Sequence, residues 1–193
     1  MRVLVVGSGA REHAMAWKLS LGSESEVIHC FPGNVIMSGV GPTYHGDPSD
    51  FPAIEEVCFS HDIDLIAVGP EIPLSAGITD YFSEKGIKVF GPTSKASMLE
   101  SSKSFAKDVL HKLNIPSPKH YAFEDANEAN KWISKNNTPV VIKADGLAAG
   151  KGVFIADTKE EQLSAVYAIM SNRIFGESGD KIVIEEKIEG PEI

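Results

Sequence analysis

The chain has 193 residues, enough for one large or two small domains, and 42% of them are hydrophobic, as in globular proteins. Its formal net charge of −9 argues against a nucleic-acid binder or a protein of the membrane surface. No apolar run approaches the roughly 20 residues of a membrane span, and the apolar start is too short for a signal-peptide core.

Two cysteines, Cys30 and Cys58, lie in apolar strand and helix contexts. We expect buried free thiols rather than a disulfide, and therefore a cytoplasmic protein with neither nucleic-acid nor membrane partners.

Strands and helices are predicted to alternate through residues 1–93. The predicted strands are 2–6, 26–31, 64–68 and 88–90, and the predicted helices are 12–21, 52–61 and 74–85, the last ending at Gly86. Such alternation predicts a parallel sheet with right-handed crossovers. We therefore expect a small doubly wound α/β domain.

The next segment, 94–118, is predicted to be a helical connector, with helices at 94–100 and 103–114 and a turn at Pro116-Ser-Pro118. From residue 119 the predicted order is a strand, helix 126–136, strand 140–144, a glycine loop, strand 152–156, helix 159–170 and strand 182–186. Two strands joined by a short glycine loop predict a hairpin, so this sheet should be at least partly antiparallel.

The run from Lys143 to Gly152 contains a loop of glycine and alanine residues. Lys143 lies before this loop and Lys151 lies near its end. The backbone N–H groups of the loop could approach phosphate oxygens without obstruction from Cβ atoms. Residues 94–151 carry nine basic and six acidic side chains, which also favours an anionic ligand. The loop is one residue short of a P-loop and has Gly152 in place of Ser or Thr. A plain hairpin turn is the alternative interpretation.

A second glycine-rich turn, Gly7-Ser-Gly9-Ala-Arg11-Glu12, follows the first predicted strand and opens a helix. Glu12 replaces the third glycine of a dinucleotide fingerprint, so the helix should pack less closely on the sheet. The second strand also lacks an acid at its end, and a nicotinamide cofactor is disfavoured. A phosphate at the helix N-terminus beside Arg11 remains attractive.

Two more segments carry candidate groups. The prolines of Gly69-Pro-Glu71-Ile-Pro73 should stiffen a loop and fix Glu71, which could accept hydrogen bonds from hydroxyls or an amine. A solvent-exposed loop acid is the alternative. In Ser101-Ser102-Lys103 a serine could cap a helix while Lys103 is simply solvated.

Taken together, the motifs resemble the phosphoribosylamine–glycine ligases, or glycinamide ribonucleotide synthetases, of the ATP-grasp superfamily. The matching pieces are VLVVGSGAREHA (3–14), PGN (32–34), VGPEIPL (68–74), FGPTSKASMLESSKSFAK (90–107), the Ile115-Pro116 turn, VVIKADGLAAGKGV (140–153) and VIEEKIEGPE (183–192). Ala10 stands where the family more often has glycine.

The resemblance implies an α/β fold with a Rossmann-like pre-ATP-grasp parallel-sheet domain (1–93), the helical connector (94–118) and the small α+β lobe of an ATP-grasp domain (119–193). It implies an N-terminal portion that stops before the large lobe and is inactive alone. The expected reaction uses ATP to join glycine to 5-phosphoribosylamine through a glycyl phosphate, in de novo purine biosynthesis. Its products are glycinamide ribonucleotide, ADP and phosphate. Ligands for Mg²⁺ or Mn²⁺ are expected beyond residue 193.

The resemblance also assigns binding residues, but no catalytic residue and no metal ligand in this chain. ATP phosphates are expected at Lys103, Lys143, Gly146, Gly150, Lys151 and Gly152, adenine at Glu185, Glu186, Lys187 and Ile188, and the ribose at Glu192. Phosphoribosylamine is expected at Gly7, Gly9, Arg11 and Glu71.

Two alternatives stay open at the level of sequence. One is a different ATP-grasp carboxylate–amine ligase, which would share the lysines but differ in the GAREHA and ADGLAAGKG segments. The other is a non-catalytic nucleotide-binding module.

Overall fold

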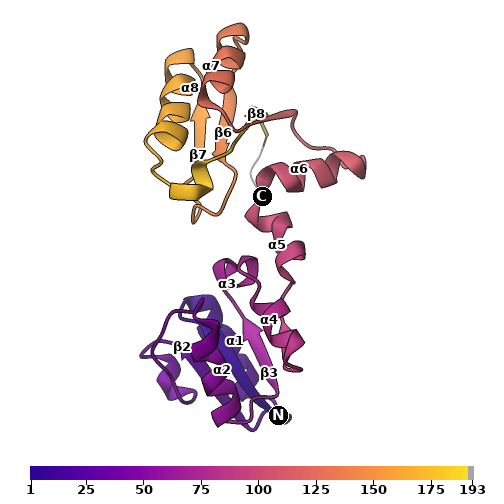
Figure 1. Ribbon diagram of the computed structural model, residues 1–193, viewed down its shortest axis with the longest axis vertical. Coiled ribbons are helices and arrows are strands. Elements are labelled where there is room, and N and C mark those ends of the chain that lie inside the picture. Colours follow the sequence, from indigo (N-terminus) through magenta and orange to yellow (C-terminus); the bar gives the residue numbers. More distant parts are fainter. Residues whose placement is uncertain (191–193) are drawn as a thin grey trace. The chain divides into compact units, whose positions relative to one another are not determined.

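The computed structural model describes residues 1–190 and contains two compact units, Met1–Ser97 and Met98–Ile193 (Figure 1). Each unit has its own sheet and its own core. The domain boundaries proposed at residues 93 and 118 stay predictions.

The sheet of the first unit has four parallel strands. They are β1 (Arg2–Gly7), β2 (Val27–Pro32), β3 (Leu65–Val68) and β4 (Lys88–Phe90), in the order β2-β1-β3-β4. Val5 lies between Cys30 of β2 and Ala67 of β3. The expected parallel sheet is confirmed, and the carboxyl ends of its strands meet at one edge.

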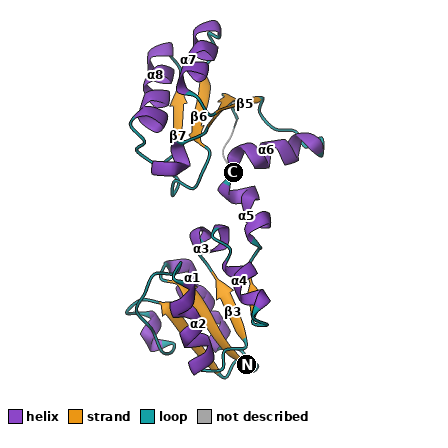
Figure 2. Ribbon diagram, in the orientation of Figure 1, coloured by secondary structure: helices purple, strands orange, loops and turns teal. Residues whose placement is uncertain are grey.

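Helices cover both faces of this sheet (Figure 2). They are α1 (Ala10–Ser20), α2 (Phe51–Ser60), α3 (Glu71–Ser75) and α4 (Ile78–Glu84), together with a 3₁₀ turn at Met37–Gly39. Alternate residues of β1 point to opposite faces. Val3 and Val5 pack with Ala16 of α1, whereas Leu4 and Val6 belong to a core that includes Ile54 of α2. The fold is therefore doubly wound, as predicted.

The helix predicted over 74–85 is divided into two helices. Gly77 has a φ of 94° and separates α3 from α4. The segment around Glu71 is also different from the predicted stiff loop, because Glu71 is the first residue of α3. Proline is well tolerated in a first helical turn, so Pro73 does not prevent this helix. Gly86, with a φ of 78°, follows α4 as predicted.

The second unit pairs an antiparallel sheet with helices. Its strands are β5 (His120–Phe123), β6 (Val140–Ala144), β7 (Val153–Ala156) and β8 (Ile182–Glu186), in the order β5-β8-β6-β7. The helices are α5 (Ser94–Ser101), which crosses the boundary between units, α6 (Lys103–Lys112), α7 (Ala126–Lys135) and α8 (Lys159–Val166). The β6–β7 hairpin is confirmed, and all neighbouring strands are antiparallel.

One face of this second sheet is buried under α7 and α8. Ile142 and Ile184 point into that core, where they join Ile133 of α7 and Val166 of α8. After α8 the chain continues as a π-helical turn, Tyr167–Ser171, and a 3₁₀ turn, Gly176–Gly179. The α-helix predicted over 159–170 is therefore present, but its last predicted turn is π-helical rather than α-helical.

Both cysteines are buried and free, as predicted. Burial raises the pKa of the Cys30 thiol to about 11 and that of Cys58 to about 12. Within residues 1–190 no helix has the length and apolar character needed to cross a membrane.

Candidate nucleotide and substrate sites

The open face of the second sheet carries a buried ion pair. Lys143 lies opposite Val183, and Glu185 lies opposite Val141, so all four side chains share the face that points away from α7 and α8. The Nζ of Lys143 lies 3.0 Å from Oε2 of Glu185. The pair sits on two neighbouring strands that are 42 residues apart in sequence.

Helix α6 brings two more lysines to this face. Lys107 places its Nζ 3.2 Å from the same Oε2 of Glu185. Lys103 donates to the main-chain oxygen of Gly146 at 3.1 Å and approaches that of Asp145 at 3.5 Å. Burial lowers the pKa of Lys103, against the opposing effect of Asp145. Three ammonium groups therefore converge beside the glycine loop, and the Glu185 carboxylate pairs with two of them.

Asp145 connects the glycine loop to α6 through hydrogen bonds. This residue was not identified from the sequence. Its carboxylate accepts hydrogen bonds from the backbone N–H of Ser104 at 2.6 Å and from Oγ of Ser102 at 2.9 Å. Ser102 is the N-cap of α6, so the predicted serine cap is confirmed, whereas Lys103 is partly buried against the loop rather than simply solvated. Asp145 satisfies a free N–H group of the first helical turn. This placement also holds Lys103 against the loop.

The loop glycines have different structural roles. A Cβ at Gly146 would overlap Ser178, and a Cβ at Gly152 would overlap Ala148, so both positions are needed for packing. Gly150 has a φ of 75° with open space around it, so only its backbone conformation favours glycine. Lys151 is exposed beside it. The predicted phosphate-covering role of the loop stays a prediction.

The residues at the end of β8 and just after it make separate contacts. Glu186 accepts a hydrogen bond from the backbone N–H of Lys119 at 2.9 Å, and Lys187 pairs with Asp157 at 2.7 Å. The side chain of Ile188 is exposed. Glu192, the predicted ribose contact, lies outside the described residues.

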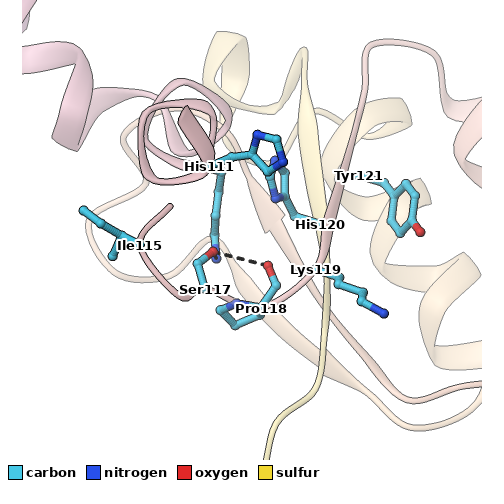
Figure 3. Close-up of a pocket in the computed structure, with 8 residues that line it drawn as sticks. His111, Ile115, Ser117, Pro118, Lys119, His120 and Tyr121 are labelled. Atoms are coloured by element: carbon cyan, nitrogen blue, oxygen red, sulfur yellow. Dashed lines mark hydrogen bonds between the residues drawn. The ribbon is translucent and has the colours of Figure 1, made fainter. Parts of the chain in front are cut away.

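A hollow of about 270 Å³ is lined in part by residues from the segment 115–121, which Figure 3 shows, and by Lys107. The residues that line it are Lys107, His111, Ile115, Ser117, Pro118, Lys119, His120 and Tyr121. Its wall contains four basic side chains and no carboxylate. The Nζ of Lys107 lies 3.1 Å from Oγ of Ser117, so Lys107 is held from both sides.

In the first unit, Glu12 organises the glycine turn at the carboxyl edge of the sheet. Its carboxylate accepts a hydrogen bond from the backbone N–H of Gly9 at 2.7 Å, and its side chain is only 5% exposed. A Cβ at Gly7 or Gly69 would overlap this side chain. Glu12 thus fills the space that the glycines leave, and the expectation that it loosens helix packing stays a prediction. Its spacing from Gly9, typical of a capping box, was the available signal.

Arg11 and Glu71 meet at this same edge, from α1 and α3. Nη1 of Arg11 lies 2.8 Å from Oε1 of Glu71, and both side chains are partly exposed. The hydrogen bond from Arg11 lowers the pKa of Glu71. Asn34 completes the edge by donating to the main-chain oxygen of Ser8 at 2.9 Å. The structure thus brings the predicted residues Gly7, Gly9, Arg11 and Glu71 together.

Comparisons with known proteins extend over the whole chain. Residues 1–100 match the family model of the phosphoribosylglycinamide synthetase N domain, and residues 101–193 match that of its ATP-grasp (A) domain. A phosphoribosylamine–glycine ligase of Halalkalibacterium halodurans is 43% identical over the full chain, which spans 45% of that relative.

Solved structures also match almost the whole chain. The phosphoribosylamine–glycine ligase of Thermotoga maritima superposes with a TM-score of 0.78 at 31% identity, over 99% of this chain and 45% of that one. A 2-oxoglutarate carboxylase biotin carboxylase domain of Hydrogenobacter thermophilus, crystallised with MgADP, gives a TM-score of 0.77 at 21% identity, over 97% of this chain and 44% of that one. The second likeness concerns the fold alone. The chain therefore spans about half the length of the relatives that it matches.

Proposed function

The chain belongs to the phosphoribosylglycinamide synthetase family, and from this premise we propose that it forms part of an ATP-dependent ligase that joins glycine to 5-phosphoribosylamine. The products would be glycinamide ribonucleotide, ADP and phosphate, within de novo purine biosynthesis. The observation that carries the proposal is the lysine cluster beside the glycine loop, in a chain that matches the family from end to end.

The cluster suits phosphoryl transfer from ATP to the carboxylate of glycine. This reaction needs positioned positive charge more than covalent help from the protein. Lys143 and Lys103 would contact the phosphates, and the loop 146–152 would cover them through its backbone, with Lys151 moving with the loop. Lys103 would exchange the main-chain oxygens that it now contacts for phosphate oxygens.

The neighbouring surface suits the base of a nucleotide. Val153 and Ile155 of β7 lie opposite Lys143 and Val141, so they share the open face. They are 46% and 65% exposed, a strip of apolar surface beside the charges. A flat aromatic ring could cover this strip and shield it from water. Backbone groups of Glu186–Ile188 would then hydrogen-bond to the ring edge, and Glu192 would hold the ribose.

The glycine turn of the first unit would hold 5-phosphoribosylamine. Free backbone N–H groups at the start of α1 favour a phosphate, and Arg11 adds a positive charge. Glu71 would accept hydrogen bonds from the sugar hydroxyls or the amine. Once glycine is phosphorylated, the amine attacks its acyl carbon, phosphate leaves, and the amine loses a proton.

Mg²⁺ or Mn²⁺ is expected for the family, but residues 1–190 hold no group of three or more His, Cys, Asp or Glu side chains that could bind a metal ion. The described residues do not fit such a site. We place the protein in the cytoplasm, without nucleic-acid or membrane partners; the two free thiols and the net charge of −9 support this.

A chimera tests the proposal. The chain would replace the matching part of the H. halodurans ligase, and ADP release would be measured with and without glycine and phosphoribosylamine. We expect release only when both are present. A folded chimera that uses another carboxylate and amine would support a different ATP-grasp ligase, and one that binds ATP without turnover would support a non-catalytic module.

A further inference from the structure

One carboxylate oxygen in the second unit serves two lysines. Oε2 of Glu185 lies 3.0 Å from Nζ of Lys143 and 3.2 Å from Nζ of Lys107. The side chains of Glu185, Lys107 and Lys143 are 5%, 12% and 25% exposed. The group is mostly buried, and Lys143 is its most exposed member.

The charges of this group constrain what each lysine can do. A buried carboxylate is costly unless a counterion and hydrogen bonds satisfy it. If Lys143 turned away to bind an anion, Glu185 would lose one of its two cations. Lys107 would remain, because α6 and the contact with Ser117 hold it in place. The second cation therefore lowers the cost of releasing Lys143.

We propose that Lys107 is a positioning residue of the nucleotide site, which neutralises Glu185 so that Lys143 is free to bind a phosphate. This inference rests on the proposed function. Lys107 acts through Glu185 and makes no contact with the nucleotide itself. Glu185 thereby acts as the resting partner of Lys143 rather than only as part of the adenine wall.

The proposal predicts opposite changes from two substitutions. In Lys107→Met, Glu185 would hold Lys143 alone, and this ion pair would shield the Lys143 amine from reagents. Its reaction with an acylating reagent should slow by about threefold to tenfold, the size expected for coupled groups in one ion-pair network. In Glu185→Gln, Lys143 loses its partner and should react faster. Lys107→Arg should behave like the unsubstituted chain.

A merely structural role predicts something different. If Lys107 only tied α6 to the sheet, Lys107→Met would loosen the cluster and make Lys143 more reactive. Lys181→Met is the matched control, because it removes an ion pair of similar length, 3.1 Å to Glu124, elsewhere in the second unit. It should leave the reactivity of Lys143 unchanged.

The experiment is trace acylation of the full chain and each variant, read by mass spectrometry at Lys143, with and without ATP. Unchanged or faster acylation in Lys107→Met would overturn the inference, and so would an equal effect of Lys181→Met. If Lys107→Met does not fold, unchanged acylation in Glu185→Gln overturns the inference, and faster acylation supports it.

The ATP arm separates the two proposals. ATP should protect Lys143 in the unsubstituted chain, and Lys107→Met should need about tenfold more ATP, as expected for a lost charged interaction. No protection of the unsubstituted chain at any ATP concentration would count against the proposed function, while the nucleotide-free rates would still decide whether Lys107 positions Lys143.

Discussion

At the scale of single residues, Lys143 and Lys151 flank one loop but have different surroundings. Lys143 is held on a strand by Glu185, whereas Lys151 is exposed at the tip of the hairpin. We predict that Lys143→Met weakens ATP binding by at least the roughly 1.5–3 kcal/mol of a charged hydrogen bond. Lys151→Met should cost less, because a mobile lysine loses entropy when it is ordered.

Nucleotide titration of the two variants checks this order. Circular dichroism of each variant controls for folding. Equal losses would mean that the buried pairing of Lys143 confers no advantage, and wild-type binding by Lys143→Met would leave the loop as a plain hairpin turn.

Glu12 gives a prediction about stability. Its carboxylate holds Gly9 and fills the space beside Gly7 and Gly69. Glu12→Ala should lower the free energy of unfolding by about 1.5–3 kcal/mol, because a hydrogen bond to a charged group is lost. Urea unfolding measures the change, with exposed Glu24→Ala as the control. Equal midpoints for the two variants would contradict a structural role for Glu12.

At the scale of elements, His29 connects β2 to two side chains from later segments, Tyr44 and His61. His29 is 5% exposed, its Nδ1 lies 2.7 Å from Oη of Tyr44, and the tilted ring of His61 lies 4.9 Å from its own ring centre. Burial, and then the charges of His61 and Arg2, lower the pKa of His29 below its ordinary value. The folded state therefore favours the neutral ring.

The sign of the pH dependence follows from that shift. Between the folded pKa of His29 and its unfolded value of about 6.5, the unfolded chain binds more protons. The stabilisation is complete above the unfolded pKa and is lost as the pH falls through the folded pKa. Urea unfolding from pH 7.5 down to 5 should show this loss, and His29→Phe should flatten the slope. An unchanged slope would mean that other groups cause it.

At the scale of the whole molecule, the two units have separate cores. Ile54 belongs to the core of the first unit and Ile169 to that of the second, and both are fully buried. Each Ile→Ala substitution should cost about 2–5 kcal/mol within its own unit. Hydrogen exchange should therefore accelerate around β1 and β3 in Ile54→Ala, and around β6 and β8 in Ile169→Ala. Equal acceleration of both sheets by either variant would contradict independent cores.

The sequence alone was enough for most elements, because helices and strands follow from short-range periodicity and caps. The alternation through β1–β4, the β6–β7 hairpin and the N-cap at Ser102 are local features of this kind. The family resemblance was equally readable, because its motifs are contiguous stretches of the chain. The break at Gly77 was missed, since nothing in the local pattern requires that glycine to adopt a positive φ.

Only the tertiary structure decided which charges meet. The alternation of side chains along a strand determines which residues of β6 share a face with Lys143, and which residues of β8 share a face with Glu185. The two side chains can pair only because β8 lies between β5 and β6, next to the strand of Lys143. Lys107 joins them only because α6 packs near β8. Glu12 is buried only because three glycines from two turns, Gly7 and Gly9 in one and Gly69 in the other, leave room for it. Such contacts depend on strand order and packing between distant segments, which short-range patterns do not encode.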